Sequence, residues 1–433
     1  MGSRGCAAGR RGLEKAQVPR APVGNPTRPA EGLLYRRRQA RGPLLSCAAT
    51  FAMTYDFTSL RSRHGTDSQK WQKYRGRDIL PMWVADMDFH AAPEIVAALR
   101  ERAGEGVFGY SRPVESTTGA VLDYLARTFG WTVDPEWLVW LPGLVPGIAM
   151  ACRAIGRRGE GVMLNTPVYP PFLSCPRLAE RVSITTALLW TGSRWEMDWD
   201  AMERSVTPQT RLFLLCSPHN PVGRIWSRAE LERLAAFCAR HDLIVCADEV
   251  HSDIAYDGIG FTAFATLSPE IAARTITLQS PSKTYNVAGL ACAYAVIPDA
   301  TLRAAFRQAG ATMLGEVNNF GYVACETAYR HGEPWRRALV QRLQANRDIL
   351  AAALRDGDLP GMTSTPIEAT YLAWLNVEAL GFNDPITFFE EAGVGLSAGG
   401  PFGDSRYVRL NFGCPEATLR EGLARMSRAL KSR

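Results

Sequence analysis

Residues 280–286 read Ser280-Pro281-Ser282-Lys283-Thr284-Tyr285-Asn286, and they follow a short apolar run at residues 274–279. The run has the length and composition of a buried strand, and Pro281 ends it. Lys283 is therefore expected on a tight loop at the end of a sheet strand, where open α/β sheets bind their ligands. Burial there disfavours the ammonium form, so the amine could act as a Schiff-base former and general base. A solvated loop lysine is the alternative interpretation.

Two further apolar runs also end in polar side chains. Residues 212–215 lead to Asn220, and residues 243–247 lead to Asp248. Between them, Ser227-Arg228-Ala229-Glu230 has the pattern of a capping box ahead of apolar residues at helical spacing. Strand–helix–strand units of this kind build a parallel sheet whose carboxyl edge carries ligand groups. The sequence thus predicts that Asn220, Asp248 and Lys283 meet at one edge of a sheet.

This combination resembles fold-type I pyridoxal phosphate (PLP) enzymes, the aspartate aminotransferase superfamily. The surrounding motifs resemble its MalY/PatB branch of cystathionine β-lyases, in family order from about Met53 to the C-terminus. They are Leu80-Pro81-Met82-Trp83-Val84-Ala85-Asp86-Met87-Asp88-Phe89, Phe108-Gly109-Tyr110, Ser217-Pro218-His219-Asn220-Pro221-Val222-Gly223-Arg224, Asp248-Glu249-Val250-His251-Ser252-Asp253 and Pro281-Ser282-Lys283-Thr284-Tyr285-Asn286-Val287-Ala288-Gly289-Leu290.

The resemblance implies a fold and an activity. The fold is α/β and PLP-dependent transferase-like, with a large domain on a mostly parallel, doubly wound sheet and a smaller α+β domain. The activity is that of a carbon–sulfur β-lyase, which cleaves cystathionine or a related cysteine thioether by α,β-elimination to a thiol, pyruvate and ammonia. The substrate would be a small amino acid, and the protein a homodimer with its active sites at the subunit interface.

The resemblance also assigns roles around PLP. Lys283 would carry the cofactor and remove the Cα proton, while Asp248 would face the pyridine nitrogen and Asn220 the phenolate oxygen. A glycine loop that opens a helix exposes backbone N–H groups at the positive end of the helix dipole, which suits a phosphate. The residues of that loop are expected to be Gly143, Leu144 and Val145. The other expected cofactor contacts are Tyr169, His251, Ser280, Ser282 and, in the neighbouring subunit's site, Tyr110, which is also a candidate catalytic residue.

Arg409 lies in an alternating, strand-like pattern at residues 405–412, where an unpaired guanidinium is costly to bury. The resemblance gives it the planar two-bond fork with the substrate's α-carboxylate, a geometry that lysine cannot copy. A structural ion pair is the alternative. Further expected substrate contacts are Trp83, Ala85 and Tyr169. A core tyrosine at 169 and a packed aromatic at 110 are the competing interpretations of those two residues.

Two positions depart from many aminotransferases of the superfamily, which have a tyrosine three residues after the aspartate and an arginine eight after the lysine. Here they hold His251 and Ala291. Both differences suit the lyase branch but leave the phosphate with fewer cationic partners. A class I/II aminotransferase and a PLP-binding regulator acting through a protein partner remain alternatives. Residues 280–283 also fit the Ser-x-x-Lys pattern of penicillin-interacting enzymes, but Ser-Asp-Asn and Lys-Thr-Gly do not occur in the sequence.

Composition sets the remaining expectations. With 433 residues, 46% hydrophobic and 21% charged, the chain suffices for one large or two medium cores. We expect an N-terminal arm with part of the small domain at 53–92, the large domain at 93–325 and the small C-terminal domain at 326–433. No stretch approaches the roughly 20 apolar residues of a membrane-spanning helix. The ten cysteines are scattered without a Cys-x-x-Cys pair, which is typical of reduced cysteines in a cytoplasmic protein. No metal site is expected.

The first 52 residues hold most of the positive charge. They carry ten Lys or Arg and two acidic residues, a net +8, whereas the whole chain carries +6 and the remainder therefore −2. We expect no nucleic-acid partner, because such a role would rest on this extension alone. The segment is rich in Arg, Gly, Ala and Pro without apolar periodicity, so no stable structure is expected there. Met53 is the preferred natural start, with a transit peptide as the alternative.

Overall fold

The structure is a computed structural model that describes residues 55–311 and 313–433. The expected extension at 1–52 and the expected start at Met53 lie outside these residues. The described chain belongs to one compact unit and contains an eight-stranded sheet, a four-stranded sheet and a two-stranded pair. None of its described helices is both long and apolar enough to cross a bilayer.

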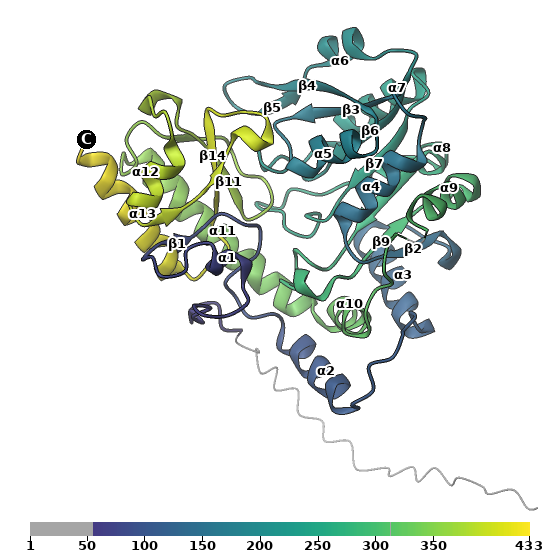
Figure 1. Cartoon of the computed structure of the whole chain (residues 1–433), viewed down its shortest axis with the longest axis horizontal. Coiled ribbons are helices and arrows are strands. Elements are labelled where there is room, and N and C mark those ends of the chain that lie inside the picture. Colours follow the sequence, from purple (N-terminus) through teal and green to yellow (C-terminus); the bar gives the residue numbers. More distant parts are fainter. Residues whose placement is uncertain (1–54, 312) are drawn as a thin grey trace, which may run out of the picture. The chain divides into compact units, whose positions relative to one another are not determined.

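The eight-stranded sheet has the order β2-β9-β8-β7-β6-β3-β4-β5 (Figure 1). Five consecutive strands are parallel to one another: β8 (Thr275–Gln279), β7 (Ile244–Asp248), β6 (Thr210–Cys216), β3 (Gly161–Thr166) and β4 (Val182–Trp190). The antiparallel pairings involve β9 (Ala293–Val296) with β8 and β2 (Leu138–Leu141), and β5 (Trp195–Met197) with β4. The predicted α/β fold with a mostly parallel sheet is confirmed.

Both faces of this sheet are buried, and β6 shows why its sequence is almost continuously apolar. Leu212 and Leu214 belong to the core on one face, whereas Phe213 and Leu215 belong to the core on the other. Successive strand residues point to opposite faces, so a strand covered on both sides needs apolar residues at every position. The runs identified in the sequence are therefore central strands.

Helices cover the two faces (Figure 1). The first core is shared with α4 (Leu144–Ala154), α5 (Pro170–Leu178) and α9 (Ala300–Gly310), and the second with α6 (Trp199–Ser205) and α7 (Arg228–Arg240). The predicted capping box is present at the start of α7, where the Ser227 side chain accepts from Glu230 N and the Glu230 side chain accepts from Ser227 N. Helix α8 (Pro269–Ala273) precedes β8.

A third core joins the remaining helices to the smaller sheet. Helix α10 (Asn319–His331) packs on α2 (Pro93–Gly104) and α3 (Glu115–Phe129), and α11 (Glu333–Arg355) packs on α13 (Glu416–Lys431). The smaller antiparallel sheet has the order β10 (Thr363–Ser364), β11 (Leu372–Asn376), β14 (Tyr407–Asn411), β13 (Ser397–Ala398). The remaining α-helices are α1 (Gln69–Gln72) and α12 (Pro385–Glu391), and the remaining strands are the parallel pair of β1 (Leu80–Pro81) with β12 (Val394–Gly395). The domain boundaries stay a prediction; the one expected after residue 325 falls within α10.

Candidate active site

Three polar side chains meet at the carboxyl edge of the large sheet. Asn220 follows β6, Asp248 ends β7 and Lys283 follows β8, and these strands are neighbours. All three side chains line one cavity of about 170 Å³. The residues that line it are Ala85, Gly143, Leu144, Val145, Tyr169, Cys216, Asn220, Asp248, Val250, His251, Ser282, Lys283 and Ala288. The structure thus brings together the three groups that the sequence places at separate strand ends.

Lys283 is enclosed at the wall of this cavity. Its Nζ donates a hydrogen bond of 2.7 Å to the main-chain oxygen of Ala85. Burial, reinforced by the nearby Arg409 guanidinium, lowers the pKa of Lys283 to about 8, although Asp86 and Asp248 act in the opposite direction. The amine is therefore closer to its neutral, nucleophilic form than a solvated lysine is. The solvated-loop interpretation does not describe this side chain.

Asp248 is a buried carboxylate with spare hydrogen-bonding capacity. Its Oδ1 accepts from Val250 N at 3.2 Å, and burial raises the pKa of the carboxyl to about 6. A carboxylate in a cavity wall favours a cationic N–H group beside it, because such a partner offsets the desolvation of its charge. A protonated heteroaromatic nitrogen meets this requirement.

Arg409 connects the small sheet to the cavity. From β14, its Nη1 donates to Asn220 Oδ1 at 3.1 Å and its Nη2 donates to Trp83 O at 3.0 Å. Within the described residues, no acidic side chain pairs with Arg409 and its buried Nε has no hydrogen-bond partner. Burial lowers the pKa of this guanidinium to about 10. A structural ion pair is therefore not its role, and an incoming carboxylate would supply the missing acceptor.

The bond from Arg409 also orients Asn220. Because the amide oxygen accepts from the guanidinium, the amide nitrogen is left as a donor toward the cavity. Tyr169, whose backbone N–H donates to Asn220 O at 3.0 Å, lines the cavity beside it. An aromatic face, an amide donor and a carboxylate thus surround the same space.

The start of α4 has features that suit an anion. Gly143 is the N-cap of this helix, and Leu144 and Val145 form its first turn, which contains no acidic residue. All three line the cavity together with Ser282. Free N–H groups and the helix dipole at this position favour a phosphate. Ser280 is turned away, since its Oγ lies 2.7 Å from Cys292 O and 2.7 Å from Ser282 Oγ.

His251 lies in the cavity wall as a neutral imidazole. Burial and the charges of Lys283 and Arg409 lower its pKa to about 3. Its Nδ1 has no hydrogen-bond partner among the described residues. This buried, unpaired nitrogen is a polar contact available to a ligand.

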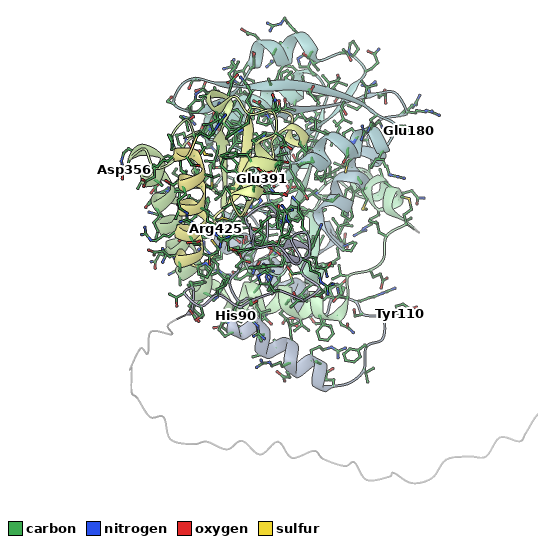
Figure 2. The ribbon with its side chains drawn as sticks, turned by 60° about the vertical axis from the view of Figure 1, so that its left-hand side comes forward. His90, Tyr110, Glu180, Asp356, Glu391 and Arg425 are labelled. Atoms are coloured by element: carbon green, nitrogen blue, oxygen red, sulfur yellow. The ribbon has the colours of Figure 1, made fainter. Side chains whose placement is uncertain are left out.

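Besides Arg409 and Ser280, two further predicted site residues are not among those that line the cavity. Trp83 contributes its carbonyl to Arg409, and its ring nitrogen donates to Lys70 O at 3.0 Å. Tyr110 is fully exposed on the segment between α2 and α3, where Figure 2 shows its side chain projecting outward. It makes no contribution to the cavity of its own chain, so its predicted role in a partner's site stays a prediction.

These residues fit PLP. The ring nitrogen suits Asp248, the phenolate oxygen suits the Asn220 amide, the phosphate suits the start of α4, and the aldehyde suits Lys283. Sequence reasoning gave no role to the lining residues Cys216, Val250 and Ala288, which supply apolar surface, although Val250 and Ala288 lie within the motifs of Asp248 and Lys283. It also missed Tyr371, whose hydroxyl donates to Ala85 O at 3.0 Å.

Comparison with known proteins gives matches over most of the chain. Residues 77–426 match the family described as aminotransferase class I and II. Cystathionine beta-lyase PatB of Bacillus subtilis (strain 168) is 38% identical over 387 residues, covering 87% of this chain and 100% of that protein. Among solved structures, OvoB has a TM-score of 0.85 at 44% identity and covers 88% of this chain and 100% of its own. Cystalysin from Treponema denticola, solved with PLP, has a TM-score of 0.83 at 31% identity with the same coverage.

Proposed function

Because this chain belongs to the aminotransferase class I and II family, we propose that it is a PLP-dependent carbon–sulfur β-lyase acting on cystathionine or a related cysteine thioether. The observation that carries the proposal is the convergence of Lys283, Asp248 and Asn220 on one cavity beside the start of α4. The curated relative PatB is named a cystathionine beta-lyase, which favours elimination over amino-group transfer.

Bound PLP supplies an aldehyde that captures the substrate amino group and a conjugated ring that accepts the electron pair left at Cα. Asp248 holds a proton on the ring nitrogen, which makes the ring a better electron acceptor. Arg409 binds the α-carboxylate and fixes which bond of Cα faces Lys283. Lys283 then removes the Cα proton as general base.

Loss of the sulfur group from Cβ completes the elimination. The departing thiolate receives a proton, and hydrolysis of the remaining fragment gives pyruvate and ammonia. The two candidate proton donors are the Lys283 ammonium and Tyr110 of a second copy of the chain. We also propose that the protein is a homodimer. Tyr110 is fully exposed, so it could act as a proton donor only in the cavity of a second copy of the chain.

The test is a pyruvate assay with purified protein, PLP and cystathionine. We expect pyruvate and a thiol in equal amounts, and no pyruvate from Lys283→Ala. Transfer of the amino group to an added 2-oxo acid without pyruvate would show an aminotransferase instead. Binding of PLP with neither reaction would favour the regulatory alternative.

A further inference from the structure

Residues 83–89, called the strap here, accept side-chain hydrogen bonds at most of their main-chain carbonyls, and the Asp86 and Asp88 side chains also pair with Arg63 and Lys70. Asn411 Nδ2 donates to two of these oxygens at 2.6 Å each, and Asn286 Nδ2 donates to two others at 3.0 and 2.8 Å. Arg409 Nη2 donates to the main-chain oxygen of Trp83, the first residue of the strap, at 3.0 Å. The donors come from β14 and from the loop of Lys283, so the strap is fixed from both the small sheet and the large one.

The central carbonyl of the strap, that of Ala85, accepts two side-chain hydrogen bonds. One comes from Lys283 Nζ at 2.7 Å and the other from the Tyr371 hydroxyl at 3.0 Å. A carbonyl oxygen has two lone pairs, so these donors use its full capacity. Tyr371 is 1% exposed and its ring meets that of His251 edge-on with centroids 6.0 Å apart, so packing restricts the movement of its ring.

We propose that Tyr371 is a positioning residue for Lys283: its hydroxyl holds the Ala85 carbonyl where that carbonyl receives the lysine amine whenever the amine is not bonded to the cofactor. The inference rests on the proposed function, because it concerns the base of that reaction. An amine that donates one N–H to a fixed acceptor directs its other N–H bonds, or its lone pair, into the cavity. Proton transfer at Cα is sensitive to that direction.

Tyr371 acts through geometry rather than charge. Burial raises the pKa of its phenol well above the ordinary range, so the hydroxyl remains a neutral donor at all working pH values. The charged groups that face Lys283 are Asp248 at the end of β7, Asp86 in the strap and Arg409 on β14, beside the neutral His251. None of these groups changes when the hydroxyl is removed.

The test compares Tyr371→Phe with Tyr256→Phe. Tyr256 is the matched control, because it is fully buried and its hydroxyl donates to the main-chain oxygen of Thr370, next to Tyr371, without touching Lys283. The first readout is kcat and KM with cystathionine. The second is the pH dependence of the rate at which cofactor-free protein takes up added PLP, followed by the visible absorbance of the bound cofactor.

For Tyr371→Phe we expect kcat to fall at least about 10-fold with KM within about 2-fold, since alignment rather than binding is lost. The midpoint of PLP uptake should move to lower pH by about half a unit or more, because a carbonyl that is no longer held stabilises the ammonium form less. Tyr256→Phe should leave both readouts unchanged. Replacing Tyr371 by 3-fluorotyrosine, which keeps the hydroxyl and the fold, should restore them.

Wild-type kcat and midpoint in folded Tyr371→Phe would overturn the inference. Equal effects of the two phenylalanine variants would also overturn it, because the loss would then reflect stability alone. Failure of 3-fluorotyrosine to restore the readouts would do the same, because the hydroxyl would then be present without effect. Thermal unfolding of each variant reports that stability separately. If the wild-type protein itself takes up no PLP or forms no pyruvate, the proposed function is wrong instead.

Discussion

Lys283 combines two demands on one side chain, because it must be buried to be reactive and burial of an amine opposes folding. Its pKa of about 8 in the folded protein lies below the unfolded value near 10.4. The folded state therefore favours the neutral amine. The contribution of this group to stability is fully present above the unfolded pKa, and it is lost as the pH falls through the folded pKa of about 8. Near neutral pH the folded protein must hold an ammonium ion in a poorly solvated wall.

Replacing this amine by a thioether of similar size should therefore stabilise the cofactor-free protein. For Lys283→Met we expect the free energy of unfolding to rise by about 1 to 3 kcal/mol near pH 7, and by less near pH 10, where the amine is neutral. The lost attraction to the Asp248 carboxylate limits the gain. Urea unfolding at the two pH values measures the difference. A gain as large near pH 10 as near pH 7 would contradict the depressed pKa.

Arg409 is expected to act by shape as well as charge. For Arg409→Lys the positive charge stays, but a single ammonium cannot reach Asn220 and Trp83 O and also present a two-bond fork to a carboxylate. We expect kcat/KM for cystathionine to fall by an amount equivalent to about 2 to 5 kcal/mol, mainly through KM. Arg406→Lys is the control, because Arg406 stands just before β14 and pairs with Asp404 away from the cavity. Unchanged kinetics of Arg409→Lys would remove its carboxylate role.

At the scale of elements, α4 must approach the sheet closely for its first turn to reach the cavity. Gly147 permits this approach, because a Cβ there would lie 2.9 Å from a Leu278 methyl carbon of β8 and 3.0 Å from one of Leu141 in β2. Contacts that short force either the leucines or the helix to move. The position of the phosphate site thus depends on a glycine that is buried under the helix.

Gly147→Val is predicted to lift α4 from the sheet. We expect stability to fall by about 1 to 3 kcal/mol from overpacking and the affinity for PLP to fall about 10-fold. Gly119→Val in α3 is the matched control, since a Cβ there meets nothing closer than Arg330 Nη2 at 3.8 Å. Both variants replace a helical glycine by valine and so change helix propensity alike, in the favourable direction, and PLP titration of the two therefore separates packing from propensity. Equal PLP affinities in the two variants would contradict the account.

The central elements could be predicted because their signal is local. Strands β6, β7 and β8 were expected within about two residues of their observed ends, since each is an apolar run closed by proline or a polar side chain. Strands β5 and β9 were not predicted. They have three and four residues, and their antiparallel pairing is set by neighbours distant in sequence.

The same distinction applies to the site. A functional side chain such as that of Asp248 is visible in the sequence as a residue type, and the motif around it predicts where it lies. The hydrogen bonds of the strap are not visible in the sequence, because their acceptors are main-chain oxygens that every residue has. The sequence accordingly does not single out Tyr371, whose approach to Ala85 becomes visible only in the folded chain.

At the scale of the whole molecule, the position of Tyr110 gives the dimer proposal a direct test. Its side chain is exposed and is not among the residues that line its own chain's cavity, so a catalytic role requires a second copy (Figure 2). Tyr110→Ala and Lys283→Ala should each be inactive as pure proteins if Tyr110 acts in the partner's site. A mixed dimer of the two variants would contain one site with an intact Lys283 from one chain and an intact Tyr110 from the other.

Unfolding and refolding the two inactive variants together should therefore restore activity. Random pairing makes about half of the dimers mixed, and each has one intact site of two, so pyruvate formation should reach about a quarter of the wild-type value per site. Mixing the folded proteins without exchange of subunits is the control and should restore nothing. Absence of recovery after co-refolding, with mixed dimers present by mass spectrometry, would mean that Tyr110 does not act across the interface, and proton donation to the departing sulfur would then fall to Lys283.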